Sequence, residues 1–151
     1  MIQVDSEINK LLKVLVHTPD VGIERITPKR AEELLFDDIV YLPKMQEEHE
    51  TFKAVLAAFA GKENVYEMQK LLHESLGMDE ALKKDALERI VDFEELPKSA
   101  YAQLNALDDK KLAEVLITGY DNQADHILFD PIPNFIFTRD IAVVVKDHII
   151  V

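Results

Sequence analysis

The stretch Leu11 to His17, LLKVLVH, decides the first element of the fold. It is apolar and rich in β-branched residues, and the ThrPro pair at 18–19 stops it, which predicts a buried β-strand. Thr27 followed by Pro28 then predicts the start of a short helix that runs towards Leu34, with the hydroxyl capping free N–H groups. The chain therefore opens as an α/β unit.

Residues 44–60 form the next periodic segment. Large side chains recur there at alternating spacings of four and three, which predicts an amphipathic helix, and Gly61 is placed to end it. The stripe consists of Met45, His49, Phe52, Leu56 and Phe59. Residues 64–68 predict a second short strand, so the order strand, helix, strand indicates an α/β layer rather than an all-helical protein.

Between about residues 69 and 122, clusters of Ala, Leu and Lys replace the β-branched runs. Predicted helices lie near 69–76, 80–91, 98–105 and 109–118, with start signals at Asp79, Pro97 and Asp108 and with Gly77 and Gly119 as helix ends. We therefore expect two parts. They are a discontinuous α/β portion, residues 1–68 and 123–151, and a helical insert, residues 69–122.

Strand patterns return after residue 124. The segment 126–129 predicts a strand, and residues 141–151 predict a hairpin. An apolar final strand with no neighbour to cover it invites self-association, so we expect a homo-oligomer or self-association through this hairpin. The same uncovered strand favours a truncated chain over a natural end at Val151.

Composition limits the class of protein. With 48% hydrophobic and 30% charged residues, the chain should fold as a soluble globule. Its formal charge of -12 argues against nucleic acid and anionic membrane surfaces as partners, because such binding depends on clustered Lys and Arg. The N-terminus does not resemble a signal peptide and the longest apolar runs are too short to span a bilayer, so we expect a cytoplasmic protein.

Residues 133–140, PNFIFTRD, carry the clearest chemical pattern. They place an amide (Asn134), an aromatic ring (Phe137) and a carboxylate (Asp140) three residues apart. A carboxylate can bind a planar guanidinium bidentately, and an aromatic ring can face the same cation. The residues alone leave another interpretation open, in which Asp140 pairs with Arg139 or caps a turn and Phe137 belongs to the core.

Other reaction centres are poorly supported by the sequence. It contains no cysteine, and its five histidines include no pair at i, i+4 and no HExxH arrangement, so a zinc site is not expected. Asp37 and Asp38 have no further ligands clustered nearby, and the four glycines are scattered singly. We expect no metal, no cofactor and no nucleotide.

Two blocks, PNFIFTRD at 133–140 and AEELLFDD at 31–38, resemble the arginine deiminase family. The resemblance extends over essentially the whole chain but corresponds to the N-terminal part of that family. It implies these site residues: Leu35, Asn134 and Phe137 in contact with the arginine substrate, and Asp140 on its guanidinium group.

The resemblance also implies a fold and a reaction. The family fold is an α/β-propeller of ββαβ modules around the substrate with a helical domain inserted early, so we expect a partial propeller here. The reaction hydrolyses L-arginine to L-citrulline and ammonia through a cysteine thiolate. The family's cysteine, catalytic histidine and second carboxylate pair would follow Val151 in order.

Two functions remain open from the sequence. One is the N-terminal portion of an arginine deiminase, inactive alone because it lacks the nucleophile and the histidine. The alternative is a non-catalytic interaction or regulatory module derived from that fold. Whether the substrate is arginine or another guanidino compound also remains open.

Overall fold

The computed structural model describes residues 4, 6, 8–26 and 40–151. The predicted short helix from Thr27 towards Leu34 lies outside these ranges. Leu35, Asp37 and Asp38 also lie outside them.

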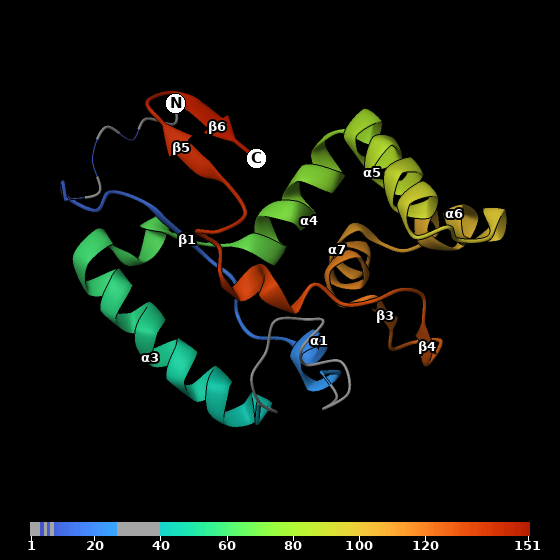
Figure 1. Cartoon of the computed structure of the whole chain (residues 1–151), viewed down its shortest axis with the longest axis horizontal. Coiled ribbons are helices and arrows are strands. Elements are labelled where there is room, and N and C mark those ends of the chain that lie inside the picture. Colours follow the sequence, from blue (N-terminus) through green and yellow to red (C-terminus); the bar gives the residue numbers. More distant parts are fainter. Residues whose placement is uncertain (1–3, 5, 7, 27–39) are drawn as a thin grey trace.

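A small parallel sheet and one long helix form the first part of the chain (Figure 1). Strand β1 (Val14–Val16) pairs in parallel with β2 (Val65–Glu67), so that Val16 lies opposite Glu67. Between them come α1 (Val21–Glu24), α3 (Leu42–Ala60) and the 3₁₀ turn η1 (Lys62–Asn64). The predicted order of strand, helix and strand is confirmed, although β1 is shorter than the apolar run that predicts it.

Helix α3 buries less of its apolar stripe than its periodicity predicts. Gly61 ends it as expected, with a φ of 91°, a conformation that glycine adopts without steric cost. Phe52 and Phe59, however, are 51% and 74% exposed. The reason is that α1, β1 and β2 cover only one side of the helix, the side on which Met45, His49 and Leu56 are partly buried.

Four helices follow, within a few residues of their predicted positions. They are α4 (Met68–Met78), α5 (Glu80–Phe93), α6 (Lys98–Asn105) and α7 (Asp109–Thr118). Their start signals act through side-chain caps, since Asp79 accepts hydrogen bonds from the amides of Ala81 and Leu82, and Asp108 accepts one from Lys111.

The two predicted helix-ending glycines behave differently. Gly119 ends α7 in the left-handed conformation, with a φ of 65°. Gly77 lies inside α4, so the prediction that it ends the helix is wrong. Asp79 is the residue at which α4 stops and α5 starts.

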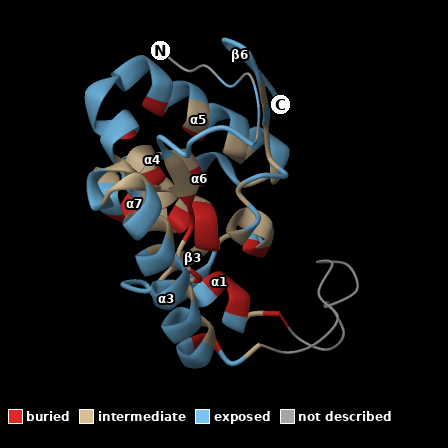
Figure 2. Ribbon diagram, turned by 90° about the vertical axis from the view of Figure 1, so that its left-hand side faces the viewer, coloured by how far each residue is buried: buried red, intermediate tan, exposed pale blue. Residues whose placement is uncertain are grey.

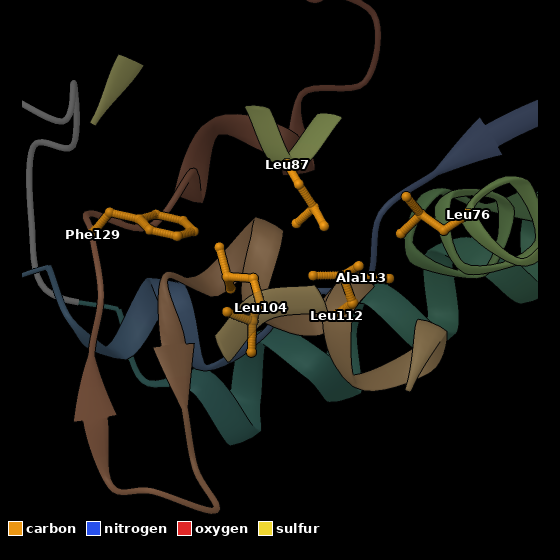
Figure 3. Packing of buried hydrophobic residues seen from close by; sticks show 7 residues of the cluster. Leu76, Leu87, Leu104, Leu112, Ala113 and Phe129 are labelled. Carbon is orange, nitrogen blue, oxygen red and sulfur yellow. The ribbon is translucent and has the colours of Figure 1, made fainter. Parts of the chain in front are cut away.

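The main core lies among these four helices (Figure 3). Helix α7 is central, because most of its residues are buried and it makes contacts with both α4 and η2. Phe129, which lies further along the chain, belongs to the same cluster. The cluster consists of Leu76, Leu87, Leu104, Leu112, Ala113, Val115 and Phe129.

The remaining elements are short. Strands β3 (Tyr120–Asp121) and β4 (His126–Ile127) form one hairpin, η2 (Pro133–Ile136) is a 3₁₀ turn, and β5 (Val143–Val145) and β6 (His148–Ile150) form a second hairpin. The described strands thus form three two-stranded sheets. This is a mixed α/β fold, and a propeller is not shown.

The second hairpin lies beside Val4 and carries exposed residues along both strands (Figure 2). Val4 exchanges two backbone hydrogen bonds with Lys146, which lies in the turn between β5 and β6. Within the described ranges, no helix is long and apolar enough to cross a bilayer.

Candidate functional site

The segment 133–140 folds as two consecutive turns rather than as a strand. The amide of Phe137 donates to the carbonyl of Asn134 at 2.9 Å, and the amide of Asp140 donates to the carbonyl of Phe137 at 2.9 Å. Three of the four predicted pocket residues are therefore linked through their backbones. Phe137 is 48% exposed, so the interpretation that it belongs to the core is wrong, and Asp140 is exposed as well.

Two neighbouring elements hold this segment in place (Figure 1). The amide of Ile132 donates to the carbonyl of Ile117 in α7 at 2.9 Å, and the hydroxyl of Thr138 donates to the carbonyl of Leu15 in β1 at 3.0 Å. Ile136 also packs against the small buried cluster around Ile23 of α1. The segment thus bridges the parallel sheet and the helical core.

A buried ionic cluster lies next to the segment, at the carboxyl ends of β1 and β2. His17, 2% exposed, has its Nε2 atom 3.1 Å from Oδ2 of Asp20 and its Nδ1 atom 3.5 Å from Oε1 of Glu67. The first contact is a hydrogen bond, and the second is an ion pair at longer range. The imidazole edge meets the ring of Phe135 at 83°, with 5.8 Å between ring centroids.

Both carboxylates are fixed by further hydrogen bonds. Asp20 accepts from the amide of Gly22 at 2.7 Å and so caps α1. Glu67 accepts from the amide and from the hydroxyl of Thr18, each at 2.8 Å. These donors hold the acids on either side of the imidazole, and the ring meets a carboxylate at each of its nitrogens.

This arrangement favours the protonated imidazole. Burial alone would lower the pKa of His17, but its contacts with Asp20 and Glu67 outweigh that effect and raise the pKa to about 9. Burial would raise the pKa of Glu67, and the contacts with His17 and Thr18 lower it instead. The contacts with Asp20 and Glu67 therefore favour an imidazolium at neutral pH.

The sequence contains a signal for this cluster outside the two family motifs. His17 is the last residue of the first predicted strand, and Glu67 lies in the next one. The carboxyl ends of adjacent parallel strands meet at one edge of a sheet, which is where polar groups of α/β proteins gather. Asp20, three residues after His17, is also a helix-cap residue type.

Other sites are not supported within the described residues. The described part of the chain contains no group of three or more potential metal ligands. An apolar groove of about 730 Å³ between α4, α5 and α7 is lined partly by Phe93 and Phe135, and neither Phe137 nor Asp140 contributes to its lining. Leu35 lies outside the described residues, so its predicted place at the substrate is untested.

The comparisons with known proteins agree with these motifs. The family model described as arginine deiminase matches residues 32–151, a range that contains the whole 133–140 segment. The chain belongs to the arginine deiminase family. This confirms the resemblance carried by PNFIFTRD and AEELLFDD.

Individual relatives cover nearly all of the chain. An arginine deiminase of Pediococcus pentosaceus is 35% identical and aligns with 92% of the chain, and one of Bacillus cereus is 34% identical over 97% of it. An arginine deiminase of Rhodococcus erythropolis is 30% identical over 98% of it. The chain spans about 40% of the length of these relatives.

Proposed function

We propose that this chain supplies one wall of the arginine pocket of an arginine deiminase, an enzyme that in its intact form hydrolyses L-arginine to L-citrulline and ammonia. The observation that carries the proposal is the PNFIFTRD segment, which lies inside the matched family range and presents Phe137 and Asp140 at the surface.

The residue chemistry supports a guanidinium ligand. The carboxylate of Asp140 can accept two parallel N–H bonds from a guanidinium, and the half-exposed ring of Phe137 can face the same planar cation. Asn134, one turn earlier, offers an amide that can both donate and accept. Leu35 completes the proposed set as an apolar contact.

Binding of this kind would fix the guanidinium for nucleophilic attack but would not perform it. The family reaction uses a cysteine thiolate, and the 151 residues contain no cysteine. We therefore propose that the chain alone is inactive and contributes substrate positioning, which can account for a large share of a barrier reduction. Three further expectations stay predictions. They are the propeller, the cytoplasmic location, and the division into an α/β portion (residues 1–68 and 123–151) and a helical insert (residues 69–122).

The β5–β6 hairpin supports a proposal of self-association. Val143, Val145, Ile149 and Ile150 are each about half exposed or more, with values from 48% to 59%. In the part of the chain that the structure describes, these strands pair only with each other and, through Lys146, with Val4. Light scattering at high concentration should show a mass above the monomer, and a clean monomer mass would contradict the proposal.

The functional proposal is tested by two assays on the purified chain. No citrulline should form from arginine, and turnover by cysteine-free protein of verified mass would refute the proposed mechanism. In calorimetry, L-arginine should bind weakly, and D140N should weaken binding about 10-fold or more, because a charge-assisted hydrogen bond contributes about 1.5–3 kcal/mol.

A matched control separates the proposed contact from general charge effects. D85N neutralises another exposed carboxylate, which pairs with Arg89 on α5. It should leave arginine binding unchanged. Equal loss in D85N and D140N would mean that arginine responds to net charge and not to Asp140.

A further inference from the structure

We propose that His17 is a positioning residue whose protonated ring holds the 133–140 segment in its substrate-binding arrangement. That the segment binds substrate rests on the proposed function. The coupling between the ring and the segment rests on geometry alone.

The His17 ring is physically linked to the 133–140 segment by two contacts. Phe135, inside the segment, meets the edge of the His17 ring, and Thr138 bonds to the carbonyl of Leu15, two residues before that histidine. In the sequence, Asn134 directly precedes Phe135, and Phe137 directly precedes Thr138. Displacement of the His17 ring would therefore act directly on the backbone that presents them.

The number of protons on the His17 ring decides how many hydrogen bonds it can donate. A protonated imidazole has two N–H donors, and a neutral one has a single donor. Two carboxylates flank His17, so loss of one proton would leave Asp20 or Glu67 facing a nitrogen lone pair in a buried site. Because both carboxylates are held by backbone amides, the ring is the group that we expect to move.

Other charged groups around the ring come from α3. Lys53 lies 3.4 Å from the hydroxyl of Thr18, and His49 is close enough for the charges on Glu67 and His17 to affect its pKa. Burial is the main reason that the pKa of His49 is lowered. His49 is therefore neutral in the range where His17 titrates.

Nuclear magnetic resonance of the isotope-labelled 151-residue chain tests the coupling directly. The imidazole signals of His17 should titrate with a midpoint near pH 9, and the amide signals of Asn134, Phe137 and Thr138 should shift with the same midpoint. Amides that do not follow the ring would overturn the proposal. No arginine is present in this experiment, so its outcome is independent of whether arginine binds.

Variants distinguish positioning from a merely structural role. In H17Q the inflection near pH 9 should disappear from the segment, whereas H148Q, which removes an exposed histidine also paired with a carboxylate, should retain it. Persistence of the inflection in H17Q would refute the inference.

A second variant keeps the test decisive if H17Q fails to fold. Asn is also a good helix cap, so D20N should preserve the start of α1 while removing one negative charge from the ring. The midpoints of His17 and of the segment amides should then move together to lower pH. Movement of the His17 midpoint alone would overturn the proposal.

Discussion

The helical part and the sheet-edge part of this molecule are held together in different ways. Helices α4–α7 enclose leucines with almost no exposed surface, including Leu87, Leu104 and Leu112. At the edge of the β1–β2 sheet, by contrast, a buried ionisable side chain, that of His17, lies between two acids next to the candidate site. The helical part is stabilised by apolar packing, and the sheet-edge cluster is stabilised by the charge of a protonated His17.

This difference teaches where each part is sensitive. Apolar packing is nearly independent of pH, and it is lost when volume is removed. A buried ionic cluster tolerates little change of charge, because an unpaired buried charge or lone pair is costly. The candidate site borders both parts, through Ile117 on the helical side and Leu15 on the sheet side.

The largest expected effect is in the helical core. L87A should lower the free energy of unfolding by about 2–5 kcal/mol, because the side chain is fully buried and its removal leaves a cavity. Urea unfolding measures the loss. L82A in the same helix is the matched control, since Leu82 is 44% exposed, and a loss as large as that of L87A there would contradict the packing described.

The next effect is the pH dependence of stability. The pKa of His17 is raised from 6.5 to about 9, so its contribution is complete below pH 6.5 and is lost as pH rises through 9. The shift corresponds to at most about 3 kcal/mol. Glu67 has a lowered pKa, so its contribution is present above 4.5 and is lost as pH falls through its folded value.

Urea unfolding at pH 6.5 and at pH 10 measures the His17 contribution. The unaltered chain should be less stable at pH 10, and H17Q should show a smaller difference between the two values. An unaltered chain that is equally stable at both values would contradict the buried imidazolium.

The smallest expected effect is a difference in stability between alanine substitutions at two glycines. G119A should cost about 1–3 kcal/mol, because the residue has a φ of 65° and a Cβ atom would collide with the carbonyl oxygen of Phe129. G77A should be close to neutral, since Gly77 lies inside α4 and a Cβ there meets only the Asp109 side chain, at 3.1 Å. Thermal unfolding of both variants compares them, and equal losses would contradict the assigned backbone conformations.

Much of the helical part could be predicted from the sequence because its signals are local. Asp79 and Asp108 cap the helices that they precede, and Gly119 ends α7 as expected. The misplaced end at Gly77 has a local explanation too. A glycine tolerates the helical conformation, and the cap at Asp79 decides where the chain turns.

The site was only partly predictable. The spacing of Asn134, Phe137 and Asp140 corresponds to two backbone turns that link these residues, and their contact with a substrate stays a prediction. The cluster of His17, Asp20 and Glu67 was missed, because it joins residues about 50 positions apart through the parallel register of β1 and β2. The exposure of Phe52 and Phe59 was missed because periodicity defines a stripe but not which neighbours cover it.

The most direct test of the central claim compares two ligands that differ at the guanidinium. L-arginine and L-citrulline should be titrated into the labelled 151-residue chain while the amide signals of Asn134, Phe137 and Asp140 are followed. Citrulline is neutral at the position where arginine carries its planar cation, so it cannot form the charged contact with Asp140. We predict that arginine shifts these three signals and that citrulline leaves them nearly unchanged. Equal shifts with both ligands, or arginine-induced shifts confined to other parts of the chain, would contradict the assignment of this segment as a guanidinium site.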